Sequence, residues 1–209
     1  MNPFTGLVHL LDHEFLRHAL IAGTAIAIAA GCIGYFLVLR GQMFTADALS
    51  HVAFTGALVA LILGFDQRVG LFAATIAVSL VLGAVGPRSS PDDTAIGAVF
   101  AWVLGLGVLA LSIFTTHHSA SRGNAGTSIL FGSLYGLDRA ATRDAVIVAA
   151  VVVVVTLAIG RALLFATVDE SVAAARGVPV RLLGYVFLAL VGTMTAQATQ
   201  AVGALLVLG

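Results

Sequence analysis

The stretch ALIAGTAIAIAAGCIGYFLVL, residues Ala19–Leu39, contains no charged side chain. Its length falls within the roughly 17–25 residues that an α-helix needs to cross the hydrocarbon core of a bilayer. Five further charge-free runs follow: Val52–Phe65, Val69–Pro87, Thr94–Thr116, Ala145–Gly160 and Leu182–Gly209. We expect the shorter runs to lengthen where flanking polar side chains face protein rather than lipid. The pattern predicts an all-α, polytopic transmembrane bundle with six or seven spans.

The composition is that of an integral membrane protein. Hydrophobic residues make up 60% of the chain, charged residues only 10%, and the mean hydropathy is +1.08, whereas soluble domains carry about 25% charged residues. The apolar runs do not alternate with period two, so we expect helices rather than a transmembrane barrel. No basic segment with a small-residue cleavage site precedes Ala19–Leu39, which favours a retained span over a removed signal peptide.

The ionisable residues exclude several function classes. All ten basic residues are arginine, and without a lysine the chain has no Walker A motif and no ATPase site of its own. The formal charge is zero and there is no basic stripe, so we expect no nucleic-acid partner. Cys32 is the only cysteine, so an internal disulfide is impossible, and a buried apolar thiol is expected.

The segment Asp47-Ala-Leu-Ser-His51 places a carboxylate and an imidazole four residues apart. On a helix these positions share one face, so both groups can converge on one ion. Ionisable groups at membrane depth are costly and indicate a functional site. We therefore take Asp47 and His51 as candidate metal ligands. Alternatively, Asp47 caps the start of a helix, and His51 is a hydrogen-bonded packing residue within the bundle.

A carboxylate and a neutral imidazole suit zinc, manganese or ferrous iron better than calcium or magnesium. Two ligands form a weak site, from which an ion can leave quickly, and a dimer would supply four. Gln197 and Gln200 are candidates for lining a pathway, although hydrogen bonds between helices explain them equally well. We expect His117 and His118 to lie in a solvated loop, because adjacent residues diverge.

The most polar helical stretch is Asp169–Arg181. Acidic residues open it, and Arg176, Gly177 and Pro179 close it, which is typical of a short helix whose dipole is compensated at both ends. Since it lies between two spans, it must be on the surface. Arginines near it favour the cytoplasmic side, and counting back five crossings then places the N-terminus outside.

Three other segments give weaker predictions. Residues 1–18 look like a short helix lying along the membrane surface. The run Ile129–Gly136 is apolar but too short to span, which indicates an interfacial or re-entrant helix. Leu182–Gly209 is long enough for one span, or for a span, a break and the start of another.

Two patches together resemble the permease subunits of zinc/manganese-type (ABC-3) metal-ion ATP-binding-cassette importers. One comprises Tyr35-Phe-Leu-Val-Leu-Arg40, Asp47-Ala-Leu-Ser-His51 and Gly56, and the other runs from Ala175-Arg-Gly-Val-Pro-Val-Arg-Leu-Leu183 to Gln200-Ala-Val-Gly-Ala-Leu-Leu206. The resemblance covers nearly the whole chain. Thr55 stands where members of the family usually have a proline, and the family normally continues through further spans.

The resemblance implies a single transmembrane permease domain over residues 1–209, as a C-terminally incomplete form of a longer permease. It implies a homodimer, a separate ABC ATPase subunit, an extracytoplasmic metal-binding protein, and a multi-pass location in a bacterial cytoplasmic membrane. The metal is transported as substrate, and no permanently bound cofactor is expected. The stretch 169–181 resembles the coupling helix that contacts the ATPase, through Asp169, Glu170, Ala174, Arg176 and Gly177. The alternatives are an intramembrane metallohydrolase or a channel-like protein that uses Asp47 and His51.

Overall fold

The computed structural model describes residues 14–85, 92–117 and 139–203. These residues form seven helices: α2 (Glu14–Leu39), α3 (Met43–Leu63), α4 (Gln67–Val85), α5 (Asp93–His117), α7 (Arg139–Val168), α8 (Glu170–Ala175) and α9 (Val180–Val202). All except α8 are long and apolar enough to cross a membrane. The predicted all-α bundle is thereby confirmed, with six candidate spans among the described residues. The predictions for residues 1–13, His118 and Ile129–Gly136 lie outside them.

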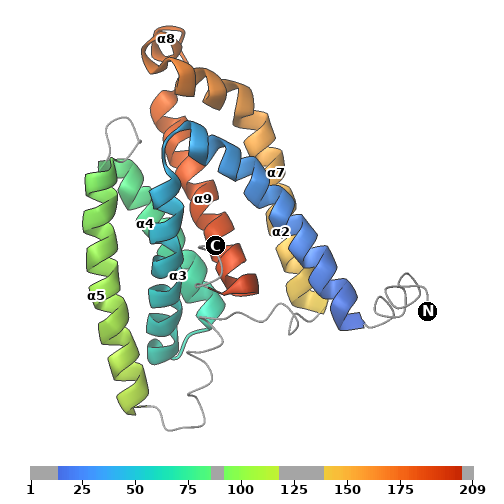
Figure 1. Cartoon of the computed structure of the whole chain (residues 1–209), viewed down its shortest axis with the longest axis vertical. Helices are drawn as coiled ribbons and strands as arrows, with labels where there is room; N and C mark the ends of the chain where they lie inside the picture. Colours follow the sequence, from blue (N-terminus) through green and yellow to red (C-terminus); the bar gives the residue numbers. More distant parts are fainter. Residues whose placement is uncertain (1–13, 86–91, 118–138, 204–209) are drawn as a thin grey trace, which may run out of the picture.

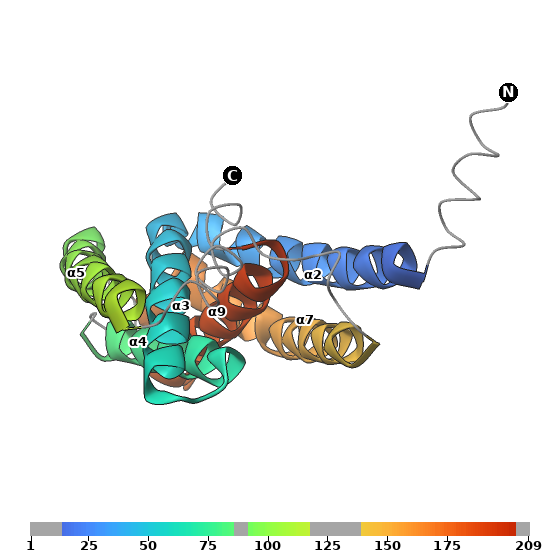
Figure 2. The ribbon, with the colours of Figure 1, turned by 90° about the horizontal axis from the view of Figure 1, so that it is seen from below.

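The spans alternate in direction (Figure 1). The α2–α3 turn, α8 and the start of α9 lie at one end of the bundle, which we call the α8 end. Seen from below, α2 and α7 lie together on one flank, α3, α4 and α5 on the other, and α9 between them (Figure 2). The main buried cluster takes side chains from all six spans, among them Ile33, Leu49 and Phe187.

Glycines at both ends of α3 reverse the chain direction. Gly41 has φ +63°, the Gly41 amide donates to the Val38 carbonyl at 3.1 Å, and the Gln42 amide donates to the Leu37 carbonyl at 2.9 Å. This is a Schellman motif, which satisfies the last carbonyls of α2. Gly64, with φ +81°, ends α3 in the same left-handed conformation. Two tight turns therefore place α2, α3 and α4 antiparallel.

Several boundaries differ from those expected. Helix α3 begins at Met43 with Gln42 as its N-cap residue, so the capping role for Asp47 is wrong. Helix α2 begins at Glu14, so residues 14–18 continue the first span and do not form a separate surface helix. Cys32 is half-buried rather than enclosed.

The last span is continuous to the residue before Gly203, which has φ +95°. Gly192, Gln197 and Gln200 all lie within α9 and do not interrupt it. Gly192 instead permits close packing, because a Cβ there would lie 2.9 Å from Ser79 Oγ and 3.0 Å from the Thr75 carbonyl oxygen of α4.

Helices α3 and α4 cross at unusually close range. A Cβ on Gly56 would lie 2.7 Å from the carbonyl oxygen of Gly70 and would also meet the Ala74 methyl group, and a Cβ on Gly70 would meet the Ala60 methyl group. Each helix thus places two small residues four positions apart at the crossing: Gly56 and Ala60 in α3, and Gly70 and Ala74 in α4. In lipid, such contacts favour association because they bring backbones within van der Waals range.

We predict that Gly56→Ala destabilises the bundle by about 1–3 kcal/mol, because the added methyl group forces α3 and α4 apart. The measurement is the thermal unfolding midpoint of the purified chain in detergent micelles. Gly31→Ala is the matched control, since Gly31 lies in α2 with nothing within 4 Å of a new Cβ. It should leave the midpoint unchanged or raise it, since alanine favours helix. Equal midpoints for the two variants would contradict the prediction.

Candidate metal site

Asp47 and His51 lie in the first half of α3, toward the α8 end. By helical rise, they are about 6 Å and 12 Å from the start of the helix. The Asp47 Oδ1 and His51 Nε2 atoms are 4.0 Å apart, and the side chains are 37% and 29% exposed. The two groups therefore face the same way, as their spacing predicts, and remain accessible at the surface of the isolated chain.

The His51 imidazole packs against Phe100, which in turn packs against Phe44. The His51 and Phe100 rings meet edge to face, with centroids 5.1 Å apart and an interplanar angle of 69°. The Phe44 and Phe100 rings are 5.7 Å apart in the same kind of contact. Phe44, Asp47 and His51 are spaced i, i+3 and i+7, on one face of α3. Phe100 of α5 thus restricts the imidazole plane beside the carboxylate, a contact that sequence reasoning missed.

Two hydroxyl groups are satisfied by backbone carbonyls of the candidate ligands. Ser50 Oγ donates to the Asp47 carbonyl at 2.7 Å, and Thr55 Oγ1 donates to the His51 carbonyl at 3.0 Å. Thr55 Oγ1 also lies 3.4 Å from the Val103 carbonyl of α5. Thr55 therefore links α3 to α5 while its hydroxyl stays hydrogen-bonded to its own helix.

The geometry of the pair is close to that of a chelate. Two metal–ligand bonds of about 2.1 Å at a tetrahedral angle separate the donor atoms by about 3.4 Å. The observed separation of 4.0 Å needs only a small side-chain movement to reach that value. No group of three or more His, Cys, Asp or Glu side chains that could hold a metal occurs within the described ranges. Within those ranges, one chain supplies two such ligands.

The two candidate pathway glutamines lie on α9, which packs against α3. Ala196, directly before Gln197, shares a buried cluster with Ala53 and Ala57 of α3, the turn that follows His51. Gln197 is only 3% exposed and Gln200 is half-buried. His117 is the last residue of α5, so its expected place in a loop is wrong.

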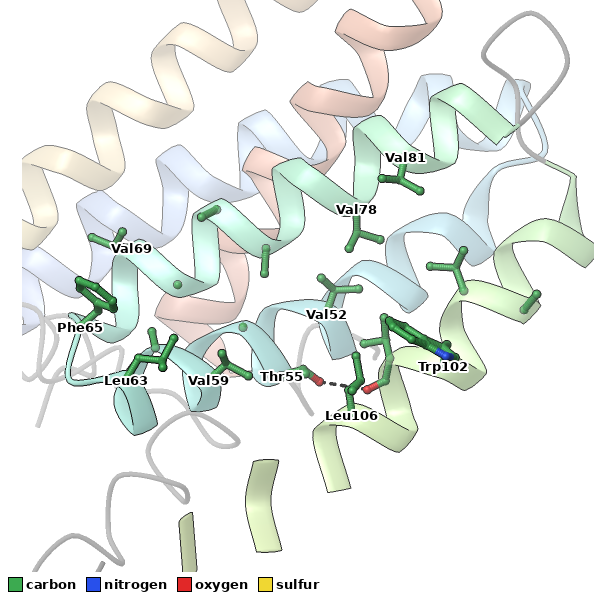
Figure 3. A pocket seen from close by; sticks show the side chains of 18 residues that line it. Val52, Thr55, Val59, Leu63, Phe65, Val69, Val78, Val81, Trp102 and Leu106 are labelled. Atoms are coloured by element: carbon green, nitrogen blue, oxygen red, sulfur yellow. Dashed lines mark hydrogen bonds between the residues drawn. The ribbon is translucent and has the colours of Figure 1, made fainter. Parts of the chain in front are cut away.

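An apolar hollow beside α3 does not include Asp47 or His51. It has a volume of about 790 Å³ and lies between α4 and α5 over α3 (Figure 3). Thr55 and Trp102 carry the only polar side-chain groups in its lining, and the Thr55 hydroxyl is hydrogen-bonded to backbone. Such a surface suits lipid or another apolar segment and offers a dehydrated cation no replacement ligands.

Helix α8 is shorter than the stretch 169–181 from which it was predicted, because Val180 already begins α9. Asp169 is its N-cap, and Asp169 Oδ1 accepts hydrogen bonds from the Val172 amide at 2.9 Å and from Ser171 Oγ at 2.7 Å. Ala173 is fully buried and anchors α8 to α7 and α9 through Ala166 and Val180. Ala174 is exposed on the other face, as are Arg176 and Gly177, which directly follow the helix.

Comparisons with known proteins agree with this architecture. A sequence model described as the ABC 3 transport family matches residues 12–209. The manganese transport system membrane protein MntC of Halalkalibacterium halodurans is 30% identical over 204 residues, which cover 95% of this chain and 66% of that protein. A probable iron transport system membrane protein of Haemophilus influenzae is 27% identical over 205 residues, which cover 98% of this chain and 73% of that protein.

A solved structure has the same fold. PsaBC from Streptococcus pneumoniae in complex with Fab superposes with a TM-score of 0.78 at 26% identity, over 98% of this chain and 73% of the matched chain. The chain described here therefore spans about two thirds to three quarters of the proteins it matches.

We predict that Asp169→Ala loosens α8, because the Val172 amide loses its acceptor. The measurement is amide hydrogen exchange of residues 170–175 at neutral pH, which should become faster. Asp169→Asn is the control, since asparagine also caps helices and should retain slow exchange. The hydrogen bond from the Val172 amide, and next that from Ser171, lower the pKa of Asp169. The ionised cap therefore contributes fully above the ordinary aspartate pKa and is lost as the pH falls through the lowered one. Unchanged exchange in Asp169→Ala would contradict the assignment.

Proposed function

The chain belongs to the ABC 3 transport family, and from this premise we propose that it is the translocating permease subunit of an ATP-binding-cassette importer for a divalent transition metal. The observation that carries the proposal is the Asp47–His51 pair on α3, with donor atoms 4.0 Å apart. Placing an ionisable side chain within a membrane span costs free energy. Two such side chains on one face of α3 therefore favour an ion pathway.

Two copies of the chain would complete the site. One copy offers a carboxylate and an imidazole, whereas zinc binds four ligands and manganese or ferrous iron more. Because Asp47 and His51 are 37% and 29% exposed, both remain accessible to a second copy. In a homodimer, two such pairs facing a common axis supply four ligands. Each pair alone binds weakly, so the ion can be released when the copies move apart.

The donor set and the relatives favour manganese or iron, with zinc as a further candidate. The matched relatives are named for manganese and for iron transport. The Asp47 carboxylate offsets the charge of a divalent cation, and the His51 imidazole disfavours calcium and magnesium, which prefer oxygen ligands.

Helix α8 is the proposed contact with a separate ABC ATPase subunit. It stands at one end of the bundle (Figure 1), and its exposed residues follow the capping Asp169. On this proposal the α8 end is cytoplasmic, the N-terminus is outside, and an extracytoplasmic metal-binding protein delivers the ion to the opposite end. The membrane is the bacterial cytoplasmic membrane.

The described arginines do not set this orientation, because they are balanced between the ends. Those toward the α8 end are Arg40, Arg161, Arg176 and Arg181, and those toward the opposite end are Arg17, Arg68, Arg139 and Arg143. The proposed orientation therefore rests on α8.

An intramembrane metallohydrolase is less well supported. Such an enzyme needs a third ligand and a general base beside the metal. Within the residues that the structure describes, no third His, Cys, Asp or Glu joins Asp47 and His51.

We predict that Asp47→Ala combined with His51→Ala lowers ATP-dependent Mn²⁺ uptake at least tenfold, because the ion loses both ligands. The measurement is uptake into proteoliposomes that contain the permease, its ATPase and its metal-binding protein. Asp144→Ala combined with His18→Ala is the matched control, since it removes the same two side-chain types from α7 and α2. The control should transport as the wild type does. Undiminished uptake by the α3 double variant would overturn the site assignment, and metal-dependent cleavage without an ATPase would favour the hydrolase.

A further inference from the structure

Arg40 occupies the turn between α2 and α3, immediately before Gly41. It is the only charged residue between His18 and Asp47. The Arg40 amide donates to the Phe36 carbonyl at 2.9 Å, and the Schellman hydrogen bonds of Gly41 and Gln42 fix the rest of the turn. Gln42 is only 2% exposed. The turn is therefore a rigid connection, with Met43 and the first turn of α3 directly after it.

The guanidinium of Arg40 packs onto α9. Its central carbon lies 5.5 Å from the centroid of the Phe187 ring, within the range of a cation–π interaction. Phe187 is fully buried and makes an edge contact with Phe36 of α2, with centroids 6.3 Å apart. The Arg40 Nε atom is buried and finds no hydrogen-bond acceptor among the described residues.

The same side chain faces α8. A cavity of about 180 Å³ lies at this junction, and its lining consists of Leu39, Arg40, Ala166, Thr167, Glu170 and Val180. Glu170 is the first residue of α8. Burial lowers the pKa of Arg40, and the negative charge of Glu170 raises it. Arg40 thus carries a charge that burial disfavours and that α8 compensates.

These contacts connect α8 to the helix of the metal pair. The negative charge of Glu170, on α8, stabilises the positive charge of Arg40. Arg40 is part of the α2–α3 turn, and α3 begins directly after that turn. Asp47 and His51 lie in the second and third turns of α3. A shift of α8 relative to α7 changes the environment of Arg40. The backbone hydrogen bonds that close the turn connect Arg40 to the start of α3 without a flexible link.

We propose that Arg40 is a positioning residue that couples α8 to α3 through Glu170 and Phe187, so that movement of α8 alters the placement of Asp47 and His51. The inference deepens the proposed function and rests on α8 being the ATPase contact. Arginine suits this role better than lysine, because its planar guanidinium stacks on an aromatic ring while its remaining donors face a carboxylate.

The test measures Mn²⁺ uptake and ATP hydrolysis in the same proteoliposomes, with permease, ATPase and metal-binding protein present. In Arg40→Gln, we expect uptake per ATP hydrolysed to fall about tenfold while ATP hydrolysis stays within about twofold of the wild-type rate. Glu170→Gln should behave alike. Arg68→Gln is the matched control, because Arg68 lies in the first turn of α4 at the opposite end of α3. It should match the wild type.

Further variants separate coupling from a purely structural role. Arg40→Gln and Glu170→Gln together should lose no more uptake per ATP than either alone, since residues in one interaction are not additive. Arg40→Lys should recover part of the loss, because it restores the charge without the planar stack. Multiplicative losses in the double variant would overturn the inference. A fall in thermal stability together with loss of ATP hydrolysis would also overturn it, as would equal behaviour of Arg40→Gln and Arg68→Gln.

The inference and the proposed function fail in different ways. Wild-type vesicles that hydrolyse ATP but take up no Mn²⁺, Fe²⁺ or Zn²⁺ would overturn the proposed function and with it the coupling role. Wild-type vesicles that transport Mn²⁺ while Arg40→Gln transports it at the same yield per ATP would overturn the coupling role alone.

Discussion

The close approach of α3 to its neighbours is the contact on which the rest of the molecule depends. In lipid, helices gain little from burying apolar side chains, because lipid tails are equally apolar, so association relies on backbone proximity and hydrogen bonds. Gly56 and Gly70 supply that proximity between α3 and α4, and Thr55 reaches the Val103 carbonyl of α5. Helix α3 is thereby held on two sides, and any group that it carries is fixed in depth and direction.

This restraint allows α3 to carry two ionisable side chains. Asp47 and His51 have no compensating Arg or Lys within ion-pair range among the described residues, so their cost must be offset by packing elsewhere on the helix. Phe100 restricts the orientation of the His51 ring, with the two ring centroids 5.1 Å apart. The Ser50 and Thr55 hydroxyls donate hydrogen bonds to carbonyl groups of α3 itself. Among the described residues, the Asp47 carboxylate and the His51 imidazole face each other as the remaining polar side chains of this surface.

The sequence was sufficient for the spans, because charge-free length is a direct measure of the ability to cross lipid. The charge-free run Val52–Phe65 gives only part of α3, because the helix already begins at Met43 and continues through Asp47 and His51. The i, i+4 pairing of Asp47 with His51 followed from helical periodicity alone. The Phe100 and Phe187 contacts join residues far apart in sequence, and no local pattern encodes them. The small residues at 56, 60, 70 and 74 were a usable signal for the α3–α4 crossing, and the isolated charge of Arg40 was one for the junction with α8.

Two features of the proposed mechanism serve release of the metal: one chain offers only two candidate ligands, and the charge of Arg40 depends on Glu170 of α8. A site with all its ligands in one rigid chain would hold a transition metal tightly, and its release would need several bonds to break within one bundle. In the proposed homodimer the ligands are divided between two copies, so the affinity for the metal depends on how the two α3 helices are placed. On the proposed function, that placement responds to ATP hydrolysis outside the membrane. The start of α3 then needs a connection to the surface whose backbone is stiff and whose outer end carries a charge. The α2–α3 turn supplies the stiff backbone through its Schellman hydrogen bonds. The Arg40 guanidinium, which packs on Phe187 and lines a cavity with Glu170, supplies the charge.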